Sequence, residues 1–165
     1  MSQTLRLKPI SPEAIPEAIK KAEHYRLLNE PEQAESICRD VLRVDPAQPR
    51  ALVVIILALT DQFGTGKAPG VVAAREYADK LPTPYERSYY SGIILERQAR
   101  ALAAKAHAGI YAYGAFREAM TWYEEAEKQR PAGNDDALLR WNSCLRAIRR
   151  ERLEPLVPDV EIQLE

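Results

Sequence analysis

Residues 18–46 read AIKKAEHYRLLNEPEQAESICRDVLRVDP, and their spacing predicts two helices joined by a tight turn. Asn29 tolerates the left-handed backbone that ends a helix, and Pro31 fits the first turn of the next one. The apolar residues after Pro31 recur three and four positions apart, which places them on one helical face. That inward face consists of Ala34, Ile37, Cys38, Val41 and Leu42.

Small residues and a closing proline occupy fixed positions within this stretch. The pattern resembles a tetratricopeptide repeat, whose signature is W-x2-L-G-x2-Y, then A-x3-F, then P. Ala119, Tyr123 and Pro131 repeat the spacing of the second half of the pattern. The strings 85–100 and 133–142 are also similar to segments of small bacterial proteins of this class. The positions that carry the resemblance are Ala18, Ala22, Tyr25, Ala34, Cys38 and Pro46.

The resemblance implies an all-α fold, a right-handed α-α superhelix of about three helical hairpins plus a C-terminal capping helix. We expect an N-terminal tail over 1–11, the repeat-like helical domain over 12–152, and a C-terminal tail over 153–165. The alternating apolar residues of that last tail favour an extended, partly ordered segment, with disorder as the alternative. The seven expected helices cover residues 12–28, 31–44, 48–62, 71–81, 85–108, 115–129 and 137–152.

Two local features inside the domain follow from the same pattern. Ala73 and Tyr77 fill the A-x3-F positions of the fourth helix, so both are expected to face its partner helix. The stretch 109–114 begins and ends with glycine, and we interpret it as the turn between the fifth and sixth helices. Small residues recur along one face of the fifth helix, Gly92 and Ala99 among them, and predict a close approach of another helix.

Charge and composition exclude several classes of partner. The 165 residues contain 23 Lys and Arg against 24 Asp and Glu, for a net charge of -1, which removes the general argument for nucleic acid or an anionic membrane. The longest apolar run, 51–59, is much shorter than the roughly 20 residues of a membrane span. Two cysteines and no secretory leader predict a cytoplasmic protein.

No group of residues predicts catalysis, a metal or a cofactor. Residues 64–67 read GTGK but lack the first glycine, the following Ser or Thr and the strand of a phosphate loop. His24 and His107 stand on separate helices without a second ligand at metal-binding spacing. Cys38 lies in a buried slot, which argues against a nucleophile. We therefore expect a protein that is not an enzyme.

Tyr85, Tyr89 and Tyr90, with nearby arginines, resemble a stacking platform for single-stranded nucleic acid. The balanced charge argues against that interpretation, and Glu86 and Glu96 are spaced for ion pairs along the helix. We expect no nucleic-acid partner.

The expected function is that of a non-catalytic adaptor, which binds a protein or peptide segment in a concave groove. The alternatives are a homo-oligomeric structural subunit, such as a homodimer, and a small helical ligand-binding regulator or enzyme. The resemblance does not extend to the carboxylate clamp of some family members, since of its positions only Asn142 fits. By helical phase, the partner-binding residues are Glu23, Arg26, Arg50, Leu57, Tyr89, Ile93, Arg97, Asn142 and Arg146.

Overall fold

This computed structural model describes residues 4–66 and 70–156 of the chain. Within these ranges the chain forms seven α-helices and one short 3-10 helix. No strand occurs in these ranges, so the expected all-α fold and its seven helices are confirmed. Most of the tail expected over 153–165 lies outside the described residues. The helices are η1 (Pro12–Ala14), α1 (Ile15–Leu27), α2 (Pro31–Val44), α3 (Pro49–Asp61), α4 (Val71–Ala78), α5 (Pro84–Ala103), α6 (Gly109–Lys128) and α7 (Asp136–Arg150).

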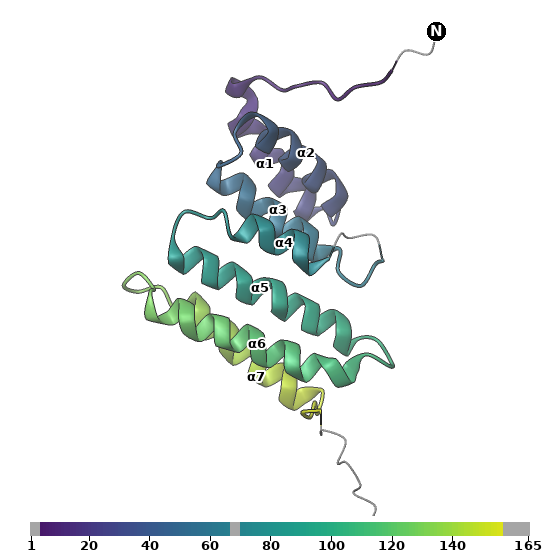
Figure 1. Ribbon diagram of the computed structural model, residues 1–165, viewed down its shortest axis with the longest axis vertical. Helices are drawn as coiled ribbons and strands as arrows, with labels where there is room; N and C mark the ends of the chain where they lie inside the picture. The colour runs from purple at the N-terminus through teal and green to yellow at the C-terminus, as the bar shows by residue number, and fades with distance from the viewer. Residues whose placement is uncertain (1–3, 67–69, 157–165) are drawn as a thin grey trace, which may run out of the picture.

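The helices form a row in which each packs against the next one in the sequence. Figure 1 shows α1 and α2 at one end of this row and α6 and α7 at the other. Contacts also join α1 to α3 and α3 to α5, so these odd-numbered helices lie next to one another. Stacked helical hairpins produce this order of contacts, because each new hairpin covers both helices of the previous one.

The first hairpin has the local geometry that its sequence predicts. Asn29 has a φ of 60°, which is the left-handed conformation, and α2 begins at Pro31. Ala34 and Cys38 are fully buried and belong to the first hydrophobic cluster, together with Ala22 of α1. Small side chains at these positions let the two helices approach closely.

Helix α3 supplies more buried residues to the first cluster than any other helix, and side chains on almost all of its sides are buried. Its apolar run is therefore enclosed by neighbouring helices, as expected for a helix in the middle of a stack. Within the described ranges, no helix combines the length and apolar character that a bilayer crossing requires.

The fourth helix differs from expectation by one residue in register. Ala74 and Ala78 are fully buried, whereas Ala73 and Tyr77 are only partly buried. One position corresponds to 100° of rotation, so the inward face of α4 is the next row of side chains. Tyr77 nevertheless packs against the first hydrophobic cluster as a partly buried side chain. Ala74 and Ala78 are the fully buried residues of α4.

The turn between the fifth and sixth helices lies earlier in the chain than the sequence predicts. Helix α5 ends at Ala103 and α6 begins at Gly109, so 109–114 is the first part of α6 and not a turn. Ala112 and Phe116 are buried, and Phe116 belongs to the second hydrophobic cluster. Burial of these side chains outweighs the weak helix propensity of glycine, about 1 kcal/mol per residue.

The helix start at α5 has a complete capping box. Thr83 Oγ1 accepts from the Glu86 backbone N–H at 3.1 Å, and Glu86 Oε2 accepts from the Thr83 backbone N–H at 3.2 Å. Pro84 follows as the first helical residue. These interactions satisfy backbone donors that otherwise lack partners at a helix N-terminus.

Helices α5 and α6 approach closely at Gly92, where the ring of Tyr123 of α6 packs against the glycine. A Cβ atom added to Gly92 would lie 2.5 Å from Tyr123 Cε1 and 2.7 Å from Cδ1. Both residues are buried, and the Tyr123 hydroxyl is held by a further bond that is described below. Only glycine fits this position without moving the ring.

We expect Gly92→Ala to lower the free energy of unfolding by about 2 kcal/mol, because the added methyl group overpacks the contact with Tyr123. Gly114 of α6 is the matched control, since it is exposed and nothing lies within 4 Å of a Cβ atom there. Gly114→Ala should raise stability by up to about 1 kcal/mol through helix propensity. Urea unfolding measures both values, and equal stability changes for the two variants would contradict the close packing.

Candidate partner-binding face

The residues expected to bind a partner come from α1, α3, α5 and α7. The structure joins several of them by hydrogen bonds that run from one odd-numbered helix to the next, and these bonds define a continuous face. We call it the odd-helix face. Its polar members are Glu23, Arg26, Arg50, Asp61, Glu96, Arg97, Arg100, Arg140 and Ser143.

Glu23 of α1 and Arg50 of α3 form a two-bond ion pair. Arg50 Nε donates to Glu23 Oε1 at 2.6 Å, and Nη2 donates to Oε2 at 2.8 Å. The Arg50 side chain is well exposed, so water and salt screen this pair strongly. It aligns α1 with α3 and leaves no net charge at this end of the face.

Asp61, at the end of α3, holds two arginines from different helices. Arg26 of α1 donates to it from Nε at 2.7 Å and from Nη2 at 3.2 Å. Arg97 of α5 also donates to Asp61, and its Nη1 further bonds the Leu57 carbonyl at 3.1 Å and Thr60 Oγ1 at 2.8 Å. The sequence analysis included both arginines but missed Asp61, the residue that unites them.

The environment of Arg97 disfavours its positive charge. Burial lowers the pKa of Arg97, and the neighbouring charges of Arg26 and Arg140 lower it too, although Asp61 opposes them. The net direction of the Arg97 pKa is downward from an ordinary value of 12.5. Arginine nevertheless stays protonated in proteins at neutral pH. One carboxylate thus offsets only part of the cost of holding these guanidinium groups together.

Glu96 of α5 is a buried carboxylate, with 1% of its side chain exposed. Its Oε2 accepts from the Tyr123 hydroxyl at 2.6 Å, and its Oε1 accepts from Arg100 Nε at 3.0 Å and Nη2 at 2.7 Å. Arg140 of α7 adds a longer bond of 3.4 Å. The sequence predicts the pair with Arg100, but not that Glu96 is buried and ties α5 to α6 and α7.

A sequence signal for this burial does exist. Glu96 lies four residues after Gly92 and three before Ala99, so it belongs to the face of small residues that approaches α6. A charged residue on such a face needs partners with hydrogen-bond donors. Tyr123 stands at the matching A-x3-F position, and its hydroxyl is the donor that a phenylalanine would lack.

The apolar members of the expected site are mostly inside the molecule. Ile93 is 2% exposed and packs in the second hydrophobic cluster, so its side chain is not accessible to a partner. Leu57 and Tyr89 are partly buried beside that cluster. We call Leu57 and Tyr89 the apolar base of the odd-helix face.

The tyrosines and arginines considered for nucleic-acid stacking have other contacts. Tyr85 and Tyr89 stack on each other with ring centroids 5.8 Å apart, and Tyr89 meets the edge of Tyr90 at 5.1 Å. Arg87 donates to the Leu81 carbonyl at 2.8 Å. The rings therefore stabilise the protein itself.

On α7, Arg140 and Ser143 are the residues that reach α5. Arg140 bonds Glu96, and Ser143 Oγ accepts from Arg100 Nη2 at 3.0 Å. Asn142 and Arg146, which the sequence analysis selected, are two and six positions beyond Arg140. At 100° per residue, Asn142 is turned away from Arg140 by about 160° and Arg146 by about 120°. The structure thus joins Arg140, and neither Asn142 nor Arg146, to α5.

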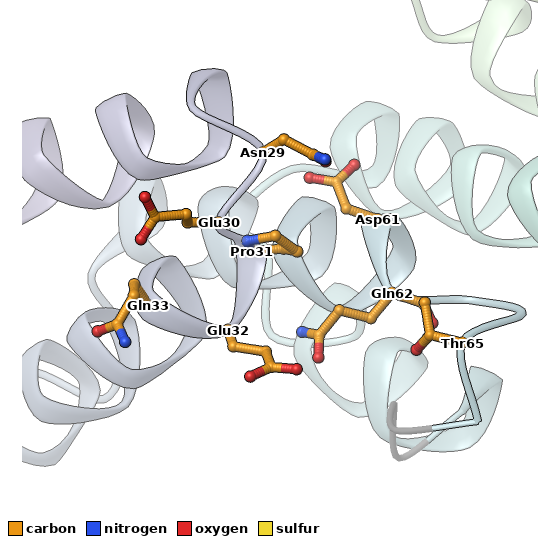
Figure 2. Close-up of a pocket in the computed structure, with 8 residues that line it drawn as sticks. All are labelled: Asn29, Glu30, Pro31, Glu32, Gln33, Asp61, Gln62 and Thr65. Atoms are coloured by element: carbon orange, nitrogen blue, oxygen red, sulfur yellow. The ribbon is translucent and has the colours of Figure 1, made fainter.

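A polar pocket of about 380 Å³ lies where the α1–α2 turn meets the end of α3. Figure 2 shows Asn29 and Asp61 pointing toward one another across it, while Gln33 points away. Asp61 is already engaged by Arg26 and Arg97. Among the described residues, no group of three or more His, Cys, Asp or Glu side chains is arranged to hold a metal ion.

We expect Glu96→Gln to lower the free energy of unfolding by about 3 kcal/mol, because it leaves two arginines without their shared carboxylate. Tyr123→Phe should cost about 1–3 kcal/mol, since one oxygen of the buried carboxylate loses its donor. Urea unfolding checks both values. Glu86→Gln, at a more exposed glutamate of the same helix, is the control, and an equal loss there would contradict the special role of Glu96.

Stability should fall at alkaline pH. Burial raises the pKa of the Cys38 and Cys144 thiols to about 12 from an ordinary value of 9.0, and burial together with the charge of Glu96 raises the pKa of Tyr123. A raised folded pKa means that stability is complete below the unfolded pKa and is lost as pH rises toward the folded one. The loss should begin near pH 9, at up to about 1.4 kcal/mol per pH unit for each thiol.

Urea unfolding at about pH 8 and about pH 10.5 measures this slope. The double variant Cys38→Ala and Cys144→Ala should lose less stability between these two values than the unaltered chain. Equal slopes would show that the two thiols ionise alike in the folded and unfolded states.

Comparison with protein-family models, with curated proteins and with solved structures found no match for this chain. The tetratricopeptide resemblance therefore rests on the residue spacing alone. What the structure adds is the all-helical row, the contacts between odd-numbered helices and the charged face that they carry.

Proposed function

We propose that this protein is a non-catalytic adaptor of the tetratricopeptide type, which binds a protein segment along the odd-helix face. The single observation that carries the proposal is the set of bonds between odd-numbered helices, from Arg50 to Glu23 and from Arg26 and Arg97 to Asp61, which aligns α1, α3 and α5 on one side. Superhelical repeat proteins use such a shared side as an extended surface for a partner.

The chemistry of this face supports recognition more than catalysis. Its carboxylates are bonded to arginines, and both cysteines are buried with pKa values raised to about 12, so a thiolate nucleophile is disfavoured. What the face offers is fixed hydrogen-bond donors over a partly apolar base. That combination suits a peptide or an amphipathic helix.

A photo-crosslinking amino acid placed at Arg50 tests the proposal, because Arg50 lies on the odd-helix face and is exposed. The full-length chain should crosslink a protein from its native extract at this position. The same probe at Arg43, an exposed residue of α2, is the matched control. A partner crosslinked equally well from Arg43 would place the binding surface elsewhere.

The double change Tyr89→Ala and Arg97→Glu should abolish that crosslink by removing the base and a donor of the face. Circular dichroism must show unchanged helix content, because Arg97 also contacts α3. If the double variant loses helix content, Arg140→Glu replaces it. Full retention of the crosslink by a folded variant would contradict the proposal.

A further inference from the structure

The odd-helix face holds more positive charge than its own carboxylates neutralise. Apart from the balanced Glu23–Arg50 pair, the face contains the guanidinium groups of Arg26, Arg97, Arg100 and Arg140, which meet two carboxylates, Asp61 and Glu96. Two positive charges are left over in a protein whose net charge is -1. The excess is local, and the fold creates it by bringing together residues far apart in the sequence.

Several donors of these arginines lack an acceptor. Within the described residues, the hydrogen bonds of Arg97 all leave from Nη1, which leaves its Nε and Nη2 hydrogens open. Arg140 bonds the Tyr89 side chain and reaches Glu96 at 3.4 Å, a long bond to an oxygen that Arg100 already contacts twice. The open Arg97 nitrogens are not among the buried atoms without a partner, so they are reachable from solvent and can donate to a bound anion.

Both arginines are partly shielded from water. The Arg97 side chain is 24% exposed and that of Arg140 is 38% exposed. The charge of Arg140 contributes to the lowered pKa of Arg97, after the larger effect of burial, and Tyr89 lies beside Arg140. An anion between Arg97 and Arg140 would reduce the repulsion between their charges and accept hydrogen bonds from the open donors. Hydrogen bonds between two charged groups are the strong ones in proteins.

The geometry points to Arg97 and Arg140, with Arg26 beside them, as a receptor for the side-chain carboxylates of an acidic peptide segment. This inference rests on the proposed function and specifies the chemistry of its partner. Arginine forks bind carboxylates in a bidentate manner, through paired N–H donors such as the free Nε and Nη2 of Arg97.

A peptide fits the face better than a nucleic acid does. Asp61 and Glu96 lie between the arginines and would repel a strand that carries a negative charge at every unit. A peptide can place isolated Asp or Glu side chains opposite the arginines and neutral residues opposite the carboxylates. The stacked rings of Tyr85 and Tyr89 are also not free to receive bases.

Fluorescence anisotropy with the purified full-length chain tests this inference. The probe is a fluorescein-labelled decapeptide of alternating glutamate and alanine, compared with its glutamine counterpart and with labelled oligothymidylate. The glutamate peptide should bind at least about tenfold more tightly than the glutamine peptide and should weaken as salt rises. Equal binding of the two peptides, or tighter binding of the oligonucleotide, would overturn the inference.

Arg140→Gln is the primary variant, because Glu96 keeps its bonds from Arg100 and Tyr123 when Arg140 is lost. It should weaken the glutamate peptide about tenfold and leave the glutamine peptide unchanged. Arg43→Gln, on the exposed side of α2, is the matched control and should bind like the unaltered chain. A folded Arg140→Gln protein with unchanged affinity would overturn the inference.

The two proposals fail in different ways. If the probe at Arg50 crosslinks a partner but the glutamate peptide does not bind, the adaptor function stands and the acidic specificity falls. If the probe at Arg50 crosslinks nothing, the adaptor function itself is contradicted. Arg97→Lys gives a further check, since it keeps the charge but loses the fork and should bind the glutamate peptide more weakly.

Discussion

The bond between the Tyr123 hydroxyl and the buried Glu96 carboxylate connects both the core and the surface of this protein. The tyrosine ring fills the space above Gly92 and brings α5 and α6 into close contact, while its hydroxyl satisfies one oxygen of Glu96. The other oxygen reaches out to Arg100 and Arg140. A single buried acid thus links the packing of three helices to the positive charge of the odd-helix face.

Burying a carboxylate is costly, and an apolar residue of similar size would often give a more stable core. The buried Glu96 carboxylate instead fixes the positions of two arginine side chains. It holds Arg100 along the surface of α5 and attracts Arg140 from α7, which lies 44 residues away in the sequence. The same logic applies at Asp61, where one exposed helix end orients arginines from α1 and α5. In both places one carboxylate positions two arginine side chains but neutralises the charge of only one of them.

Two hydrophobic clusters share the molecule. The first is built mainly from α1 to α4 and the second from α5 to α7. Val71 and Tyr90 pack against both, and Ile94 of α5 belongs to the first. Helix α5 therefore lies between the two clusters and contributes side chains to both. This position explains why α5 carries so many of the buried residues and why its polar side chains meet partners from several helices.

Local sequence features were sufficient to predict where most helices begin and end. Asn29 and Pro31 define the first turn by their own backbone preferences, and small residues at regular spacing mark the buried faces of α2 and α6. Such features act over a few residues, so they can be interpreted without knowing the neighbours. The start of α6 at Gly109 was not predictable in this way, because it depends on the burial of Ala112 and Phe116 in the folded structure.

The sequence by itself determined an all-helical chain with the arginines and aromatic residues of its candidate site. Only the tertiary structure decided which row of α4 faces inward, that Glu96 is buried, and that Arg140 belongs to the odd-helix face. The physical reason is that these properties depend on contacts between helices distant in the sequence. Composition shows a balanced charge, but the positions of the charges in space determine where an uncompensated excess remains.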